Sequence, residues 1–337
     1  MDKIQRKFFA DLQSIYTQSL NLNRGCMCPN CESKPIFSHV FTRNLILKPI
    51  CPDSKIYLFE PQSLVHIEDD DMLRYYPRGL KEAFGFNGFC SVHDNNVFAD
   101  IEPKHGKVDW SNIRSQYLLS YRSICREAYV NRVTHDVIWH QINCSISNDP
   151  NYQFRNFKIL ANINTTYDNI IAYKKFLEKG VYSKDYSEIQ FHYIELPFQF
   201  DLCISSPINV VDDRGPCFKY SFQETNLVNV FPYCGKTIII LGYSDKFGNK
   251  WMNKIIPMFK SSYPHIVSAA FVELLYRTEL NAIGPKLFEQ LEPDLLEAFY
   301  STYRLEASNF SYEIENQISC LFYKPLKTIM PDSWKTL

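Results

Sequence analysis

The stretch CMCPNC at residues 26–31 decides the fold of this part of the chain, together with the stretch CSVH at residues 90–93. The first holds three of the eleven cysteines, and the second pairs a cysteine with a histidine three residues later. A Cys-x2-Cys knuckle and a Cys-x2-His pair together supply the four ligands of a tetrahedral zinc ion in its Cys3His form. The sequence therefore predicts one zinc site made from two distant segments.

The expected zinc ligands are Cys28, Cys31, Cys90 and His93, with Cys26 as the alternate if the first knuckle uses its outer thiol. The other interpretation is that these are ordinary buried thiols, because free cysteine is among the most buried residue types. We expect that role for the cysteines that stand singly, which are Cys125, Cys144, Cys203, Cys217, Cys234 and Cys320.

The composition indicates a globular protein of the cytoplasm. The chain has 337 residues, with 36 Lys and Arg against 37 Asp and Glu, and 45% of its residues are hydrophobic. No apolar run approaches the roughly 18 residues that a membrane-spanning helix needs, and residues 1–16 mix charges into their apolar positions, unlike a secretory signal. Because thiols stay reduced in the cytoplasm, the cysteines point to metal ligands or core packing instead of disulfides.

The hydrophobic pattern predicts an α+β fold in two domains. Residues 1–110 are expected to form a zinc-stabilised module with an N-terminal helix, and residues 111–337 a larger α+β domain with an antiparallel sheet flanked by helices. The expected helices cover residues 4–20, 112–143, 252–259, 266–277, 285–303 and 312–322, with a further one beginning at Cys90. The expected strands cover residues 35–41, 56–60 and 63–67 and the regions 188–208 and 217–243, and residues 68–71 form an acidic loop.

Charge is unevenly distributed along the chain. Residues 111–184 carry ten Lys and Arg against five Asp and Glu, a local excess of +5. Such an excess is typical of a surface that meets a polyanion, although solvated helix faces without a partner would give the same count.

The order of the motifs resembles the HNH, or ββα-metal, nucleases. That order is a Cys-x2-Cys knuckle, a short strand ending in a histidine (Ser38-His39), and a Cys-x2-His segment that opens a helix. The resemblance covers about residues 24–102 and implies that the zinc is structural. It also implies that His39 is the general base, and that Asp94, with Asn87 or the neighbouring Asn95, holds a catalytic magnesium or manganese ion. Bacterial proteins with this layout suggest an effector of anti-phage defence.

The sequence departs from the commoner pattern of that family in three ways. No acidic residue precedes His39, Asp94 stands where the last histidine is usual, and nearly fifty residues replace a short hairpin between strand and helix. His39 has two other interpretations, a structural histidine on a buried strand and a zinc ligand in place of His93.

Two functions of different classes are compatible with these observations. The first is a metal-dependent endonuclease that cleaves DNA or RNA, with the C-terminal domain recognising a protein partner or a trigger, or associating with itself. The second is a non-enzymatic protein in which zinc clips the fold together and the aromatic-rich C-terminal part binds protein or a small ligand. The near-zero net charge favours the second, because a nuclease usually offers a basic groove to the phosphate backbone.

Overall fold

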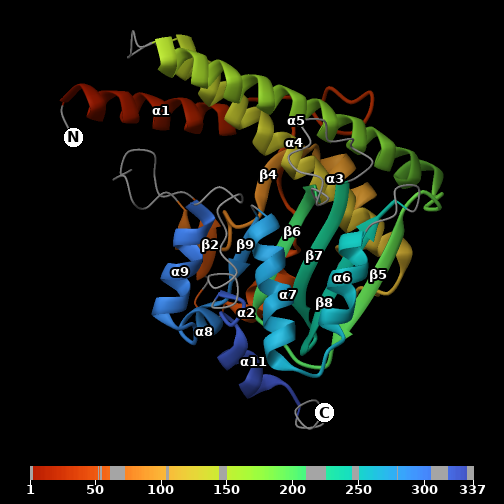
Figure 1. The fold of residues 1–337 in the computed structure, drawn as a ribbon. Helices are drawn as coiled ribbons and strands as arrows, with labels where there is room; N and C mark the ends of the chain where they lie inside the picture. Colours follow the sequence, from red (N-terminus) through yellow and green to blue (C-terminus); the bar gives the residue numbers. More distant parts are fainter. Residues whose placement is uncertain are drawn as a thin grey trace.

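The computed structural model has two antiparallel sheets flanked by helices (Figure 1), which confirms the expected α+β class. The structure describes residues 3–51, 53, 55–60, 73–103, 106–143, 150–209, 225–244, 250–278, 280–304 and 318–331. The expected strand 63–67, the acidic loop 68–71 and most of the expected helix 312–322 lie outside these residues, as do Cys144 and Cys217.

The larger sheet has seven strands in the order β3-β2-β9-β6-β7-β8-β5, and every recorded pairing is antiparallel. Its strands are β2 (Lys55–Glu60), β3 (Arg74–Gly79), β5 (Gln190–Leu196), β6 (Leu202–Asn209), β7 (Thr225–Tyr233), β8 (Lys236–Tyr243) and β9 (Asn281–Ile283). A tight turn joins β7 to β8, where Cys234 and Gly235 both have positive φ angles (51° and 79°), as the turn of a two-residue hairpin requires.

The central strands of this sheet are buried on both faces. Successive side chains of a strand point to opposite faces, so Ile238 and Ile240 enter one hydrophobic core while Ile239 and Leu241 enter another. This explains why β8 reads as an unbroken apolar run. The first core contains residues of α4 and of the cysteine-rich turn at residues 26–31, and the second contains residues of α6, α7 and α9.

Helices form the outer layers (Figure 1). The two longest, α4 (Ile113–Asn143) and α5 (Pro150–Ser183), pack against each other over much of their length, and α1 (Lys3–Asn21) lies along α4. On the other face of the sheet are α6 (Lys250–Phe259) and α7 (Pro264–Arg277). The shorter helices of the C-terminal part are α8 (Pro285–Phe288), α9 (Pro293–Arg304) and α11 (Tyr323–Ile329).

The smaller sheet carries the metal-ligand region. It pairs β1 (Ile36–His39) with β4 (Gly85–Phe89), and α3 (Ser91–Val97) begins two residues after β4 ends. A π-helical turn (Arg43–Leu47) and the short α2 (Lys48–Ile50) follow β1. The chain then leaves for the larger sheet, adds β2 and β3 to it, and returns as β4. The larger sheet therefore runs across residue 110, and the division into two domains at that residue stays a prediction.

Some of the helices and strands expected from the sequence need correction. The structure has one long helix, α5, over residues for which no element was expected, and β3 runs through Pro77, where a break was expected. Pro77 is tolerated there because β3 is an edge strand. One side of such a strand has no neighbouring strand, so a missing backbone N–H on that side costs no hydrogen bond of the sheet. The single helix expected over residues 285–303 is divided into α8 and α9. Among the described helices, none has the length and apolarity that crossing a membrane requires.

Candidate metal centre

The first half of the metal centre is a tight turn between α1 and β1. Gly25 and Asn30 have positive φ angles (75° and 56°), and these two positions turn the chain so that Cys26 and Cys31 approach each other. The backbone N–H of Met27 donates to the carbonyl of Gly88 in β4, at 2.8 Å. This bond joins the turn to the end of the strand that leads into the second half.

The second half begins where β4 ends. Cys90 is the N-cap residue of α3, and the first turn of that helix carries His93. The backbone N–H of Cys90 donates to the sulfur of Cys26, at 3.3 Å. Such a donor stabilises negative charge on a thiolate, as a metal ligand needs.

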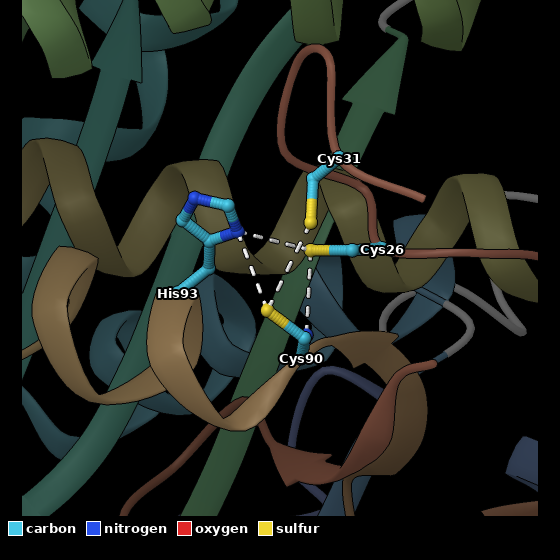
Figure 2. A group of neighbouring side chains, drawn as sticks. All are labelled: Cys26, Cys31, Cys90 and His93. Carbon is cyan, nitrogen blue, oxygen red and sulfur yellow. Dashed lines mark hydrogen bonds between the residues drawn. The ribbon is translucent and has the colours of Figure 1, made fainter. Parts of the chain in front are cut away.

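Four side chains converge between the two halves (Figure 2). The ligand atoms of Cys26, Cys31, Cys90 and His93 all lie within 4.8 Å of one another. Nδ1 of His93 is 3.4 Å from the sulfur of Cys26 and 3.4 Å from that of Cys90, and the sulfurs of Cys31 and Cys90 are 4.0 Å apart.

These separations fit a tetrahedral zinc ion. With Zn–S bonds of about 2.3 Å and Zn–N bonds of about 2.0 Å, tetrahedral geometry places sulfur and nitrogen roughly 3.5 Å apart and two sulfurs roughly 3.8 Å apart. Three thiolates and an imidazole are also the donors that zinc prefers over magnesium or calcium. The cluster could therefore hold one metal ion such as zinc, with His93 binding through Nδ1, and within the described residues no other group of three or more Cys, His, Asp or Glu side chains could hold one.

The thiols of the centre differ in their acidity. Burial raises the pKa of Cys26 to about 12, whereas hydrogen bonds from the backbone and hydroxyl of Ser33 lower the pKa of Cys31 to about 7. Cys31 thus ionises readily near neutral pH, while the buried Cys26 thiolate needs a cation beside it. A bound metal ion supplies that charge.

Cys28 lies outside this cluster, and the alternate ligand Cys26 takes its place. Cys28 is buried, with 3% of its surface exposed, and burial raises the pKa of its thiol. Its neighbours are Tyr182, Lys174 and Glu178 of α5. The shape of the turn explains why Cys26 and not Cys28 belongs to the cluster. The chain bends at residues 27–28, where the Cys28 side chain is buried in the core, and the left-handed residue Asn30 then brings Cys31 back toward Cys26.

A buried lysine attaches the metal-ligand turn to α5. Nζ of Lys174 donates to the carbonyl of Met27 at 2.7 Å and forms an ion pair with Glu178 one turn further along the helix. The hydroxyl of Tyr121 in α4 donates to the same carboxylate at 2.9 Å. The position of the turn is therefore fixed by both long helices as well as by the candidate ligands.

His39 lies at the end of β1. Its Nε2 is 3.1 Å from the carbonyl of Lys81, and because a carbonyl only accepts, Nε2 carries the proton and Nδ1 has the lone pair in the neutral ring. Burial lowers the pKa of His39, and the charges of Arg43 and Arg122 lower it further, against the opposing effects of the Lys81 bond and Glu102. The imidazole is therefore neutral at pH 7 and able to accept a proton at Nδ1. It is not part of the metal cluster.

Asp94 bonds to a buried arginine. Arg122 of α4 has no exposed surface, and it donates to Asp94 at 2.9 Å and to Glu102 at 2.6 Å. The guanidinium also lies over the ring of Phe98, 4.2 Å from its centre. Asp94, Glu102 and Arg122 thus form one charged neighbourhood, and the charges of Arg122 and Glu102 also act on His39.

The two asparagines of the expected site do not join this neighbourhood by any recorded bond. The amide nitrogen of Asn87 donates to the carbonyl of Leu20 at 2.9 Å, and that of Asn95 donates to the carbonyl of Ser91 in its own helix at 2.7 Å. Neither bond supports a role in holding a cation beside Asp94.

Sequence reasoning missed Glu102 and Arg122. Arg122 stands among the buried residues Leu118, Tyr121 and Cys125 of α4. A charged residue inside an apolar helix stripe must find a buried partner, and this was the available signal. Glu102 had no comparable signal, since it follows a short helix in an irregular segment.

The basic stretch of residues 111–184 becomes the two helices α4 and α5. Within the described residues, three of its cations form recorded ion pairs, Arg114 with Asp100, Arg122 with Asp94 and Glu102, and Lys174 with Glu178. Arg122 and Lys174 are buried, so they cannot meet a polyanion.

Among the single cysteines, Cys125 and Cys203 are buried as expected, Cys320 is partly exposed, and Cys234 is exposed in the β7–β8 turn, contrary to expectation.

Comparison with protein-family models, with curated proteins and with solved structures gives no match for this chain.

Proposed function

We propose that the protein is a metal-dependent endonuclease of the ββα-metal kind, in which zinc is structural and His39 is the general base. The observation that carries the proposal is the neighbourhood of His39: a neutral imidazole whose Nδ1 has no recorded partner among the described residues, at the end of a strand tied to the metal centre, and near Arg122, which bonds Asp94. The order of ligand turn, strand, strand and helix supports it, because the HNH modules place their general base on the first strand.

The role of His39 follows from its tautomer. A water oxygen attacks the phosphorus atom while its proton moves to Nδ1 of His39, the bond from phosphorus to the leaving oxygen breaks, and that oxygen takes a proton from solvent. Arg43 lies near His39, is exposed, and forms no ion pair within the described part of the chain. It is therefore available to bind the phosphate of a DNA or RNA substrate.

In this proposal Asp94 binds the magnesium or manganese ion. Arg122 bonds Oδ1 of Asp94 and leaves the second carboxylate oxygen free of recorded partners in the described residues. A hard divalent cation prefers such oxygens, and when bound it stabilises the charge on the leaving oxygen. The bonds of Asn87 and Asn95 to backbone carbonyls make Asp94 the residue on which this role rests.

The proposal is tested by incubating plasmid DNA, single-stranded DNA and RNA with the zinc-loaded protein and Mg²⁺ or Mn²⁺. His39→Ala is expected to lower the cleavage rate about 100-fold or more while leaving zinc content and thermal stability unchanged, the usual size of a general-base effect. The matched control is His135→Ala, a partly exposed histidine of α4. Cleavage at the wild-type rate by the His39 variant would refute the assignment of the base.

A second candidate is a non-enzymatic, zinc-stabilised binding protein that acts as a subunit of a larger assembly. It is favoured by the bonds that Asn87, Asp94 and Asn95 already make within the protein. In this case none of the three nucleic acids is cleaved in Mg²⁺ or Mn²⁺, although elemental analysis still gives one zinc per chain.

A further inference from the structure

The buried arginine of α4 joins an acidic residue of α3 to another that lies beyond the end of that helix. Arg122 donates through one terminal nitrogen to Asp94, within α3, and through the other to Glu102, beyond the end of α3. The exposed fraction of the side chain is 0% for Arg122, 13% for Asp94 and 29% for Glu102. The cation is thus fully covered, and the two carboxylates lie between it and the surface.

Stability alone is a weak reason for such an arrangement. Removing a guanidinium from water is costly, and apolar side chains of similar volume often replace buried ion pairs with no loss of stability. Nε of Arg122 has no hydrogen-bond partner among the described residues, which adds to the cost. The arrangement does fix the positions of the two carboxylates, because the guanidinium is planar and rigid and bonds both of them.

Each carboxylate bonds Arg122 through one oxygen only. The recorded bonds use Oδ1 of Asp94 and Oε1 of Glu102. Within the part of the chain that the structure describes, no bond is recorded for Oδ2 or Oε2. Two fixed carboxylates, each with a second oxygen available, are the groups that orient a water molecule or bind a hard cation.

The segment that follows His39 is bonded to the segment that carries Glu102. The hydroxyl of Thr42, three residues after His39, donates to the carbonyl of Ile101, the residue before Glu102, at 3.2 Å. This bond ties the chain that follows β1 to the chain that follows α3. The charges of Arg122 and Glu102 act on the imidazole of His39.

We propose that Arg122 is the positioning residue of the His39 site and that Glu102 is a further member of it: Arg122 holds one oxygen of Asp94 and one of Glu102, and so fixes both carboxylates in the charged neighbourhood that His39 senses. This inference rests on the proposed nuclease function. It adds two residues that the resemblance to HNH modules does not supply.

The first test follows the titration of His39 by NMR, with its signal assigned from the His39→Ala variant. Arg43, Arg122 and Glu102 are the charged groups that act on His39, which also bonds the Lys81 carbonyl. Arg122→Met removes a positive charge that lowers the pKa of His39, so the titration should move to higher pH. Glu102→Gln removes a negative charge that raises the pKa, so the titration should move to lower pH. The matched controls are Arg114→Met and Asp100→Asn, an exposed pair involving the same helix, and they should leave the titration in place.

The second test is the cleavage rate. Arg122→Met and Arg122→Lys should each lower kcat on the order of 100-fold with KM unchanged, because lysine keeps the charge but cannot hold two carboxylates in one plane. Glu102→Gln should lower kcat in the same way, and Glu102→Asp should restore part of it. An unchanged kcat in the Glu102→Gln and Arg122→Lys variants would overturn the inference.

The two tests separate the inference from the proposed function. If the wild-type protein cleaves no nucleic acid, the nuclease proposal fails, yet the titrations still decide whether Arg122 and Glu102 act on His39. If the wild-type protein cleaves but the His39 titration is the same in Glu102→Gln as in the wild type, the inference alone is wrong. Glu102 is partly exposed, so this variant remains informative even if Arg122→Met does not fold.

Discussion

A pair of serine substitutions two residues apart tests the metal centre most directly. Cys26→Ser replaces one of the four candidate ligands, while Cys28→Ser replaces a buried thiol that packs against α5. Both changes exchange sulfur for oxygen at the same turn, so each serves as the control for the other. Cys26→Ser should lose zinc, and Cys28→Ser should keep it.

The expected magnitude follows from the ligand count. Structural zinc sites contribute about 10–16 kcal/mol of apparent binding free energy at pH 7. Four ligands share this in the cluster of Cys26, Cys31, Cys90 and His93, so one ligand accounts for roughly 2.5–4 kcal/mol. Zinc affinity should then fall about 100- to 1,000-fold in Cys26→Ser. A buried thiol-to-hydroxyl change without loss of the metal costs about 1 kcal/mol of folding free energy, which is the expectation for Cys28→Ser.

The assay is competition for zinc with a chelator of known affinity, with the metal content of each purified protein measured by elemental analysis. Thermal unfolding with and without excess chelator shows how much of the stability depends on the metal. The wild type and Cys28→Ser should both lose stability on chelation, whereas Cys26→Ser should respond less. Zinc content at the wild-type level in Cys26→Ser, together with loss of zinc in Cys28→Ser, would refute the choice of ligands.

Two further predictions concern charged groups away from the ligands. Lys174→Met removes the donor to the Met27 carbonyl and leaves Glu178 buried without its cation, so the free energy of unfolding should fall by about 3–5 kcal/mol in urea titrations; Lys175→Met, an exposed neighbour, is the control and should change little. Burial alone would raise the pKa of Asp136, but the bonds from Ser19 and Arg24 lower it overall. Its contribution to stability should therefore be complete above the unfolded pKa of about 3.9 and be lost as the pH falls through the folded pKa. Asp136→Asn should then be less stable than the wild type at pH 7 and approach it near pH 2, and a constant difference across this range would contradict the assignment.

The sequence predicted the elements whose pattern is strong. The helix over residues 112–143 became α4, and the run of alternating aromatic and β-branched residues became β5 to β8. It did not predict α5, whose apolar residues do not concentrate on one face and whose helical form depends on packing along α4. The short strand β9 has three residues, too few for a period to be recognised.

The metal centre was predicted to the level of its two segments but not to the level of each thiol. A Cys-x-Cys-x2-Cys stretch offers three cysteines for two positions, and spacing alone cannot choose between Cys26 and Cys28. The choice depends on which thiol the core admits, and that is decided by α5, more than 140 residues later in the sequence. The same holds for Arg122, since its partners come from another segment of the chain.

The position of β2 and β3 between the two halves of the metal centre has a consequence for the order of folding. A metal ion bound to Cys26 and Cys90 closes a loop of about sixty residues, and this loop contains two strands of the larger sheet. Closing so long a loop costs chain entropy before any contact repays it. Full coordination should therefore come late, after the larger sheet has brought β1 and β4 together, and the rate at which the refolding chain takes up zinc should report on the assembly of the whole molecule.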